Sequence, residues 1–259
     1  MPFTLAHPAA VMPLRRLRFL PTPALIAGSV APDLPYYMPS RIDAALHETH
    51  TLWGSVVLCV PLGLALIAVG LVLRRQLTAL MTERARWVCL REAEWFAARP
   101  MNWLLAIPAI LIGAWTHILW DGFTHPGTWL VRRVDALSAP VNLFGMYTGE
   151  TSHVLQYVSS IAGLAVVAYW YSLVAAQAPP EGSSGGNRAP ARWLLLLVVA
   201  LAAIAMGSFQ ALRTFHQPPT VYRLIYLLLT RTFAWFMLLY VVTGTLVART
   251  QRRQPQLEA

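Results

Sequence analysis

Charged residues are scarce in this sequence, and lysine is missing altogether. Only 12% of the 259 residues are charged, against 57% hydrophobic residues, and the mean hydropathy is +0.52. A chain this apolar does not fit an ordinary soluble domain, so we predict an integral membrane protein. The length suits a single membrane domain over residues 1–259, with no room for a separate soluble domain.

The basic residues are all arginine and are spread over several predicted loops. The net charge of +9 therefore forms no single positive patch, and we expect no nucleic-acid partner. Two cysteines, Cys59 and Cys89, make neither a CxxC motif nor a disulfide framework. The first residues lack the basic, apolar and cleavage regions of a signal peptide, so we expect residue 1 to belong to the mature protein.

Five apolar runs are long enough to cross a lipid bilayer as helices. The predicted spans are residues 52–73, 102–122, 154–176, 193–212 and 224–248. Their prolines and glycines are tolerated in transmembrane helices. Residues 178–190, rich in proline, glycine and serine, predict a flexible linker. The predicted fold class is all-α, with about five transmembrane helices.

The segments outside the spans differ in character. Prolines interrupt residues 1–51, where we expect one or two short interfacial or re-entrant helices, with Pro8 and Pro23 near helix starts and a stop near Asp33. Residues 74–100 are charged and predict an amphipathic surface helix. The loop after the second span is mixed in composition and long enough to cover a site.

The distribution of arginine predicts the topology. With five spans, the first loop, the third loop and the carboxyl-terminal tail share one side and hold eleven arginines, while the opposite side holds eight. The positive-inside rule then places the carboxyl terminus in the cytoplasm and the protein in the inner membrane. The end of the second span faces outward in this arrangement.

The second span ends in residues of the metal-ligand type. His117, Asp121 and His125 fall at i, i+4 and i+8, about 80° apart from first to last on a helix, so they share one face. A carboxylate among apolar side chains needs a cation, a metal or hydrogen-bond donors. The spacing therefore indicates a metal-binding face at the membrane surface.

Further ligand-type residues precede the first span. His47 and His50 flank Glu48 at a spacing that differs from the HExxH zinc signature. Asp33 follows the expected end of a helix, where its carboxylate can point toward the others. Imidazoles and carboxylates suit zinc, manganese or iron. Glu48 is a candidate general base for a metal-activated water, with a solvated capping role as the alternative.

Isolated polar residues have simpler explanations. A hydrogen bond to the backbone or to a lipid headgroup explains a lone histidine such as His7, His153 or His216. Arg231, in the outer third of the last span, is a candidate contact for an anionic phosphate; snorkelling to the interface or pairing with a carboxylate is the alternative. Aromatic residues near the span ends fit membrane-interface anchors better than a substrate site.

Several motifs together resemble a known family. They are Met1-Pro-Phe-Thr-Leu-Ala-His7-Pro, Gly28-Ser-Val-Ala-Pro-Asp33, His50-Thr51-Leu52 and Thr116-His117-x-x-Trp120-Asp121-x-x-Thr124-His125. In combination they resemble the bacterial family of unknown function numbered four-one-eight-four. The resemblance covers most of the chain and implies a multi-pass membrane protein without an assigned activity.

A more distant resemblance concerns the order of the Pro-Asp, His-x-x-His-Thr and His-x-x-x-Asp-x-x-Thr-His motifs. This order is similar to that of membrane-bound metal-dependent hydrolase-like proteins. The resemblance implies a set of metal ligands, namely Asp33, His50, His117, Asp121 and His125. The segment that begins at His47 departs from the distant group, which tends to carry His-Arg before its Thr-His.

Two functions from different classes follow from these residues. The first is a divalent-metal-dependent hydrolase that acts on a phosphoester or amide of a lipid or envelope component at the outer membrane face. The second is a non-catalytic, metal-stabilised scaffold or transport accessory protein. An open position in the metal shell would favour the first and a closed shell the second. A solute transporter is disfavoured, because no mid-span charged pair or symmetric broken helices are predicted. The sequence does not predict the oligomeric state.

The predicted topology can be tested by cysteine labelling. Single cysteines introduced as His47→Cys and Thr128→Cys, in a chain whose native cysteines are replaced, should react with a membrane-impermeant maleimide from the same, outer side. Labelling of the two positions from opposite sides would refute the topology.

Overall fold

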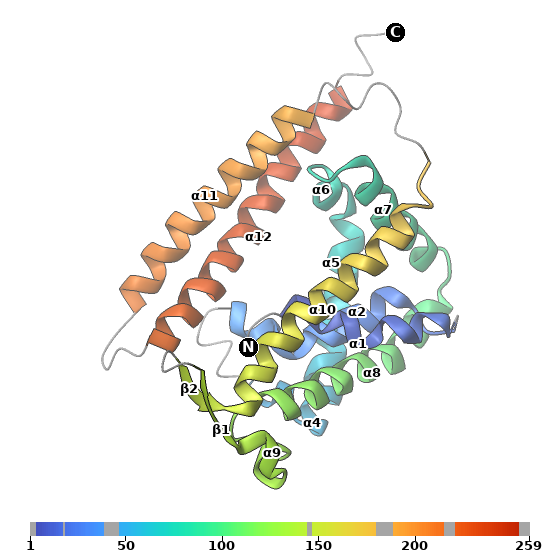
Figure 1. The fold of residues 1–259 in the computed structure, drawn as a ribbon. Coiled ribbons are helices and arrows are strands. Elements are labelled where there is room, and N and C mark those ends of the chain that lie inside the picture. The colour runs from blue at the N-terminus through green and yellow to red at the C-terminus, as the bar shows by residue number, and fades with distance from the viewer. Residues whose placement is uncertain are drawn as a thin grey trace. The chain divides into compact units, whose positions relative to one another are not determined.

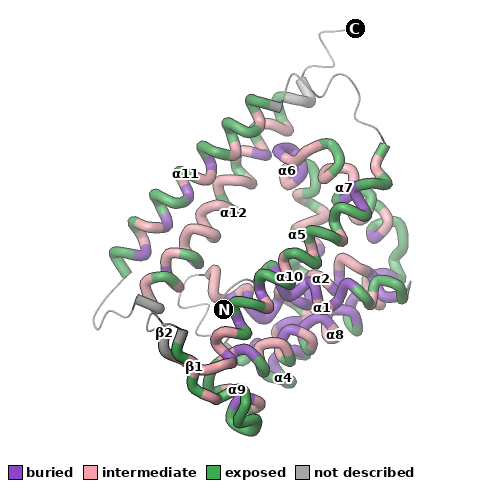
Figure 2. Tube along the Cα trace, in the orientation of Figure 1, coloured by how far each residue is buried: buried purple, intermediate pink, exposed green. Residues whose placement is uncertain are grey.

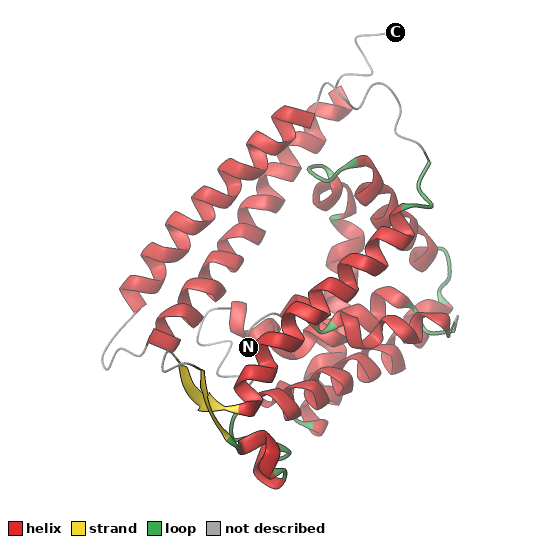
Figure 3. Ribbon diagram, in the orientation of Figure 1, coloured by secondary structure: helices red, strands yellow, loops and turns green. Residues whose placement is uncertain are grey.

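The structure, a computed structural model, is helical almost throughout (Figure 3). It describes residues 4–17, 19–38, 47–143, 147–179, 189–214 and 221–253. Among these residues, five helical segments are long and apolar enough to cross a membrane: Leu52–Val72, Met101–Thr124, Thr151–Ala175, Pro190–Thr214 and Leu224–Thr250. Each overlaps a predicted span, so the predicted all-α, multi-pass membrane fold is confirmed.

The helices and strands follow one another in a simple order. They are η1 (Thr4–Ala6), α1 (Pro8–Val11), η2 (Met12–Arg16), α2 (Thr22–Val30), η3 (Ala31–Tyr37), η4 (His47–His50), α4 (Leu52–Gly54), η5 (Ser55–Cys59), α5 (Val60–Val72), α6 (Arg74–Thr78), α7 (Glu83–Ala97), α8 (Met101–Thr124), η6 (Val131–Arg133), α9 (Asp135–Ser138), β1 (Pro140–Leu143), β2 (Tyr147–Glu150), α10 (Thr151–Ala175), α11 (Ala189–Thr214) and α12 (Val221–Arg253).

The chain forms two compact units. The first unit comprises residues 1–35, 44–67 and 96–173, and the second comprises residues 36–43, 68–95 and 174–259. In the first unit α2 lies beside α8, and in the second α11 lies beside α12 (Figure 1). The single membrane domain expected from the length stays a prediction.

Small residues bring α2 and α8 unusually close. A Cβ atom added to Gly28 would lie 2.2 Å from the carbonyl oxygen of Ile110, and one added to Gly113 would lie 2.4 Å from that of Leu25. Close approach through glycine is a common way for membrane helices to pack, since lipid gives no hydrophobic drive for association. Buried residues are accordingly concentrated along α1, α2 and α8 (Figure 2).

The outer faces of the long helices are apolar. Large side chains such as Leu104 and Leu119 on α8, and Leu197 and Leu201 on α11, are exposed. In water such surfaces would be unfavourable, whereas hydrocarbon accepts them, so this pattern agrees with lipid-facing helices.

The amino-terminal segment forms the short helices that its prolines predict. Pro8 opens α1, and Pro23 occupies the first turn of α2, where a missing N–H costs nothing. Helix α2 ends at Val30, close to the stop predicted near Asp33. The chain passes from α2 directly into the 3-10 helix η3, which contains Asp33 and continues to Tyr37.

Two other segments extend the sequence-based picture. Residues 74–100 contain α6 and α7 in place of one surface helix. The loop after the second span contains an antiparallel hairpin that the sequence did not predict, with Pro140 opposite Glu150. Strands of four residues carry little periodic signal, and proline and glycine have low strand propensity. The predicted linker lies mostly outside the described residues.

Side-chain hydrogen bonds fasten η4 and the start of the first span to the rest of the first unit. Trp115 Nε1 on α8 donates to Ser55 Oγ at 2.9 Å. Cys59 Sγ donates to the Thr49 carbonyl oxygen at 3.3 Å. Cys59 thus has a packing role, and the end of η4, which carries His50, is held close to α8.

The close packing of α2 and α8 predicts a position-specific effect of alanine. Gly113→Ala should lower the thermal unfolding temperature of the purified protein, since the added methyl group meets backbone atoms and overpacking costs about 1–3 kcal/mol. Gly70→Ala is the matched control, because a Cβ there meets nothing within 4 Å. Equal unfolding temperatures for the two variants would contradict this packing.

Candidate metal centre

Four ligand-type side chains converge in the first unit. Asp33 comes from η3, His50 from the end of η4, and His117 and Asp121 from one face of α8. One nitrogen or oxygen atom from each residue lies within 4.8 Å of the atoms from the other three. The i, i+4 spacing on α8 therefore places His117 and Asp121 on one face of the helix, as the sequence predicted. Asp33 and His50 come to the same place from two other segments.

The distances between these atoms suit a small ion. His117 Nε2 lies 3.3 Å from Asp121 Oδ2 and 3.5 Å from Asp33 Oδ1. His50 Nε2 lies 3.4 Å from Asp33 Oδ1 and 3.7 Å from Asp121 Oδ2. At the corners of a tetrahedron with metal bonds of about 2.0–2.2 Å, ligand atoms are about 3.3–3.6 Å apart. Three of these four distances fall within that range, and the fourth is 0.1 Å outside it.

Hydrogen bonds orient both imidazoles with Nε2 toward the centre. His117 Nδ1 lies 2.8 Å from the Ser29 carbonyl oxygen, which can only accept, so Nδ1 carries the proton. Thr49 Oγ1 donates to the Pro32 carbonyl oxygen at 2.9 Å and can accept from His50 Nδ1 at 3.3 Å. In the neutral imidazoles each Nε2 then has its lone pair inward, which is how outer hydrogen bonds prepare histidine ligands.

Each carboxylate likewise has one oxygen in contact with an outer partner and the other oxygen turned toward the centre of the cluster. Thr4 Oγ1 donates to Asp33 Oδ2 at 2.6 Å, while Asp33 Oδ1 faces the centre. Asp121 Oδ2 also faces the centre, and its Oδ1 lies 3.3 Å from His125 Nδ1 and 3.5 Å from His7 Nε2. Every member of the set is therefore held by one atom and presents another inward.

Two of the inward atoms are buried without a hydrogen-bond partner. These are Asp33 Oδ1 and His117 Nε2. Buried polar atoms are nearly always satisfied, so two orphaned atoms 3.5 Å apart, both turned toward one centre, call for a ligand there. The residues thus fit a divalent metal ion, and the cluster can hold one.

Electrostatics at the edge of the cluster agree with a cation. Burial alone would raise the pKa of the Asp33 carboxyl, but nearby positive charge, which a protonated His117 supplies when no ion is bound, holds that pKa well below its ordinary value. Burial, aided by the nearby His117, lowers the pKa of His7 to about 3. Asp33 is therefore ionised and His7 neutral at physiological pH.

His125 lies beside the cluster but outside the set of four. Helix α8 ends at Thr124, and His125 already has extended backbone angles, so it leaves the face on which its spacing placed it. Gln156 Nε2 on α10 donates to His125 Nε2 at 2.8 Å, which leaves the proton on Nδ1 to face Asp121. His125 is thereby positioned to orient Asp121.

His7 is a residue of the site that the sequence analysis treated as isolated. Its ring stacks on that of His117 with centroids 3.7 Å apart and lies edge-on to Trp120. His7 and His117 are far apart in the sequence, so no periodic pattern links them. The signal that could have found His7 is its place in the first of the motifs that carry the family resemblance.

The remaining predicted residues have other positions. Glu48 is exposed on η4 and is not among the four clustered residues. The side chain of His47 and all of His216 lie outside the described residues. His153 packs its ring against Tyr157 on α10. In the second unit, Arg231 Nη1 donates to the Met38 carbonyl oxygen at 3.2 Å.

The fold and the cluster together define a multi-pass α-helical membrane protein with a candidate metal centre near one end of its second span. A family model described as a domain of unknown function (DUF4184) matches residues 1–248, so the chain belongs to this family. The family indicated by the sequence motifs is therefore confirmed. Searches of curated proteins and of solved structures found no match.

The donor set predicts that the metal depends on these side chains. Protein purified through a histidine-free tag should contain near-stoichiometric zinc, manganese or iron by elemental analysis, and Asp121→Ala should remove it. Thr4→Val, which takes away only an outer hydrogen bond, should weaken metal affinity about 10–100-fold. Metal-free wild-type protein of full stability would contradict the assignment.

Proposed function

We propose that the protein is a divalent-metal-dependent hydrolase that cleaves a phosphoester or amide of a lipid or envelope component at the outer membrane face. The observation that carries this proposal is the donor set: two imidazole nitrogens and two carboxylate oxygens, each turned inward by an outer partner. Mixed nitrogen and oxygen donors suit zinc, manganese and iron, the usual metals of hydrolytic sites. A bound ion of this kind supplies Lewis acidity and makes water acidic enough to ionise near neutral pH.

The position along α8 supports a lipid-like substrate. Asp121 lies three residues and His117 seven residues before the end of this 24-residue helix. At 1.5 Å per residue they lie about 5–10 Å from its end, near the depth of headgroup bonds. A site at this depth can receive an ester or amide bond from the membrane without drawing the acyl chains into water.

Access to the cluster is uneven. The side chains of His117 and Asp33 are 0% and 1% exposed, whereas those of Asp121 and His50 are 13% and 26% exposed. A substrate would therefore approach from the side of His50. Glu48 is exposed on the same short helix, which supports its proposed role as a general base that takes a proton from water.

The second candidate is a metal-stabilised scaffold or transport accessory protein. The observation that favours it is the number of donors, because four protein ligands are enough to close a tetrahedral shell, as in structural zinc sites. Carboxylates can release or share a position more readily than thiolates, and we therefore place the hydrolase first. Metal that stabilises the fold without any turnover would support the scaffold.

Separate variants distinguish metal binding from catalysis. With a panel of phosphoester and amide lipids in nanodiscs, His50→Ala should abolish turnover while expression is retained. Glu48→Gln should keep the metal and lower turnover about 10²–10⁴-fold, the range of general-base catalysis. Glu83→Gln, which alters an exposed carboxylate on α7, is the matched control and should leave turnover unchanged.

Two outcomes would count against the hydrolase. Turnover that survives both His50→Ala and removal of the metal by a chelator would place the chemistry elsewhere. Metal bound at full occupancy, with no lipid on the panel cleaved and a lower unfolding temperature after chelation, would replace the hydrolase by the scaffold.

A further inference from the structure

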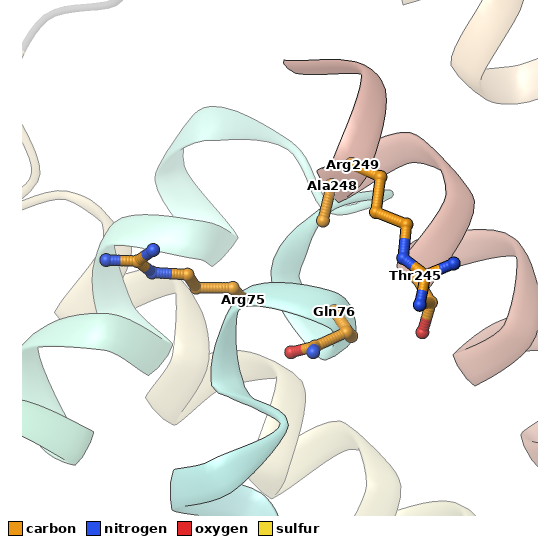
Figure 4. Close-up of a pocket in the computed structure, with 5 residues that line it drawn as sticks. All are labelled: Arg75, Gln76, Thr245, Ala248 and Arg249. Carbon is orange, nitrogen blue, oxygen red and sulfur yellow. The ribbon is translucent and has the colours of Figure 1, made fainter. Parts of the chain in front are cut away.

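The second unit contains a small cavity between α6 and α12, separate from the residues of the metal centre. Its volume is about 250 Å³, and it is lined by Arg75, Gln76, Thr245, Ala248 and Arg249 (Figure 4). All five lining residues that the structure describes are cationic or uncharged. The cavity is smaller than the about 300 Å³ at which pockets for drug-sized molecules begin, so it suits one headgroup-sized moiety.

The cavity lies where two spans end. Helix α6 begins at Arg74, two residues after the first span ends at Val72, and the fifth span ends at Thr250, one residue after Arg249. Residues at the end of a span are near the boundary between hydrocarbon and headgroups, where lipid phosphates lie. Basic pockets between helix ends at this level are favourable places for anionic lipid headgroups.

The walls of the cavity are fixed by packing. A Cβ atom on Gly244 would lie 2.2 Å from the Gln76 carbonyl oxygen, so glycine is needed for α12 to approach α6 this closely. Tyr240 on α12 donates from its hydroxyl group to the Leu77 carbonyl oxygen at 2.8 Å. These contacts hold α6 against α12.

The polar groups that line the cavity can bind both a phosphate and a hydrogen-bond donor. Arg249 extends beside Thr245, whereas the guanidinium group of Arg75 extends away from the other four residues (Figure 4). Gln76 Oε1 is buried without a hydrogen-bond partner. A guanidinium group binds phosphate through paired N–H donors, and the orphaned amide oxygen can accept from a hydroxyl or ammonium group on the same ligand.

We propose that this cavity binds the phosphate group of an anionic membrane lipid whose headgroup also carries a hydrogen-bond donor. Arg249 contacts the phosphate, Gln76 accepts from the headgroup, and Arg75 adds the second positive charge from the rim. Phosphatidylglycerol has this chemistry, since it joins one negative phosphate to free hydroxyl groups. The site is independent of the metal centre and of the proposed hydrolase activity.

Native mass spectrometry of the full-length protein can test the site. Phosphatidylglycerol should bind saturably and more tightly than phosphatidylcholine, and Arg249→Gln should weaken its binding at least about tenfold. The loss of one surface charge would by itself weaken the binding of an anionic lipid about fivefold. The matched control is Arg84→Gln, which removes an exposed cation of α7 in the same loop as Arg75 and should weaken binding by no more than that fivefold.

Two further measurements separate binding in the cavity from general attraction to surface charge and from binding of free phosphate. Ala248→Trp keeps both arginines but fills the cavity, so it should abolish saturable binding of phosphatidylglycerol while the unfolding temperature is retained. Inorganic phosphate at millimolar concentration should not displace the lipid. Equal losses for Arg249→Gln and Arg84→Gln, unchanged binding of phosphatidylglycerol by Ala248→Trp, or displacement of the lipid by inorganic phosphate would each overturn the proposal.

Discussion

The hydrogen bond between His117 Nδ1 and the Ser29 carbonyl oxygen joins the fold of the first unit to the chemistry of its site. It forms because α2 and α8 approach closely at Gly28 and Gly113, which brings a backbone carbonyl of one helix to an imidazole of the other. The bond fixes the tautomer of His117, and the buried Nε2 lone pair then faces two carboxylates. Helix packing through glycine therefore determines which ring nitrogen of a candidate metal ligand faces the centre of the cluster.

Burying two carboxylates in an apolar helical protein is unfavourable unless something compensates their charge. Asp33 accepts a hydrogen bond from Thr4 on Oδ2, and Asp121 Oδ1 lies 3.3 Å from His125 Nδ1 and 3.5 Å from His7 Nε2. The other oxygens share a centre with two imidazole nitrogens. A divalent ion would satisfy all four atoms at once, whereas proton sharing among the imidazoles would leave the orphaned atoms at hydrogen-bond distances longer than 3.2 Å.

Residues of this site that lie close together in the sequence could be predicted more easily than residues that lie far apart in it. Helical periodicity places His117 and Asp121 on one face, because they lie one turn apart, and it extends that face to His125 only if the helix continues. The helix ends at Thr124, and no local signal fixed that boundary to one residue. Asp33 and His50 were indicated by their ligand-type side chains and by motif resemblance, but the inclusion of His7 depends on tertiary packing that a single sequence does not reveal. The spans were predictable from composition, whereas the short hairpin was not.

X-ray absorption at the metal edge tests the central claim most directly. Protein purified through a histidine-free tag should show a first shell of nitrogen and oxygen at about 2.0–2.2 Å, with the outer scattering of two imidazoles and no sulfur. That spectrum would match the donors Asp33, His50, His117 and Asp121. A sulfur-containing shell, a shell without imidazole scattering, or the absence of any metal edge would contradict it.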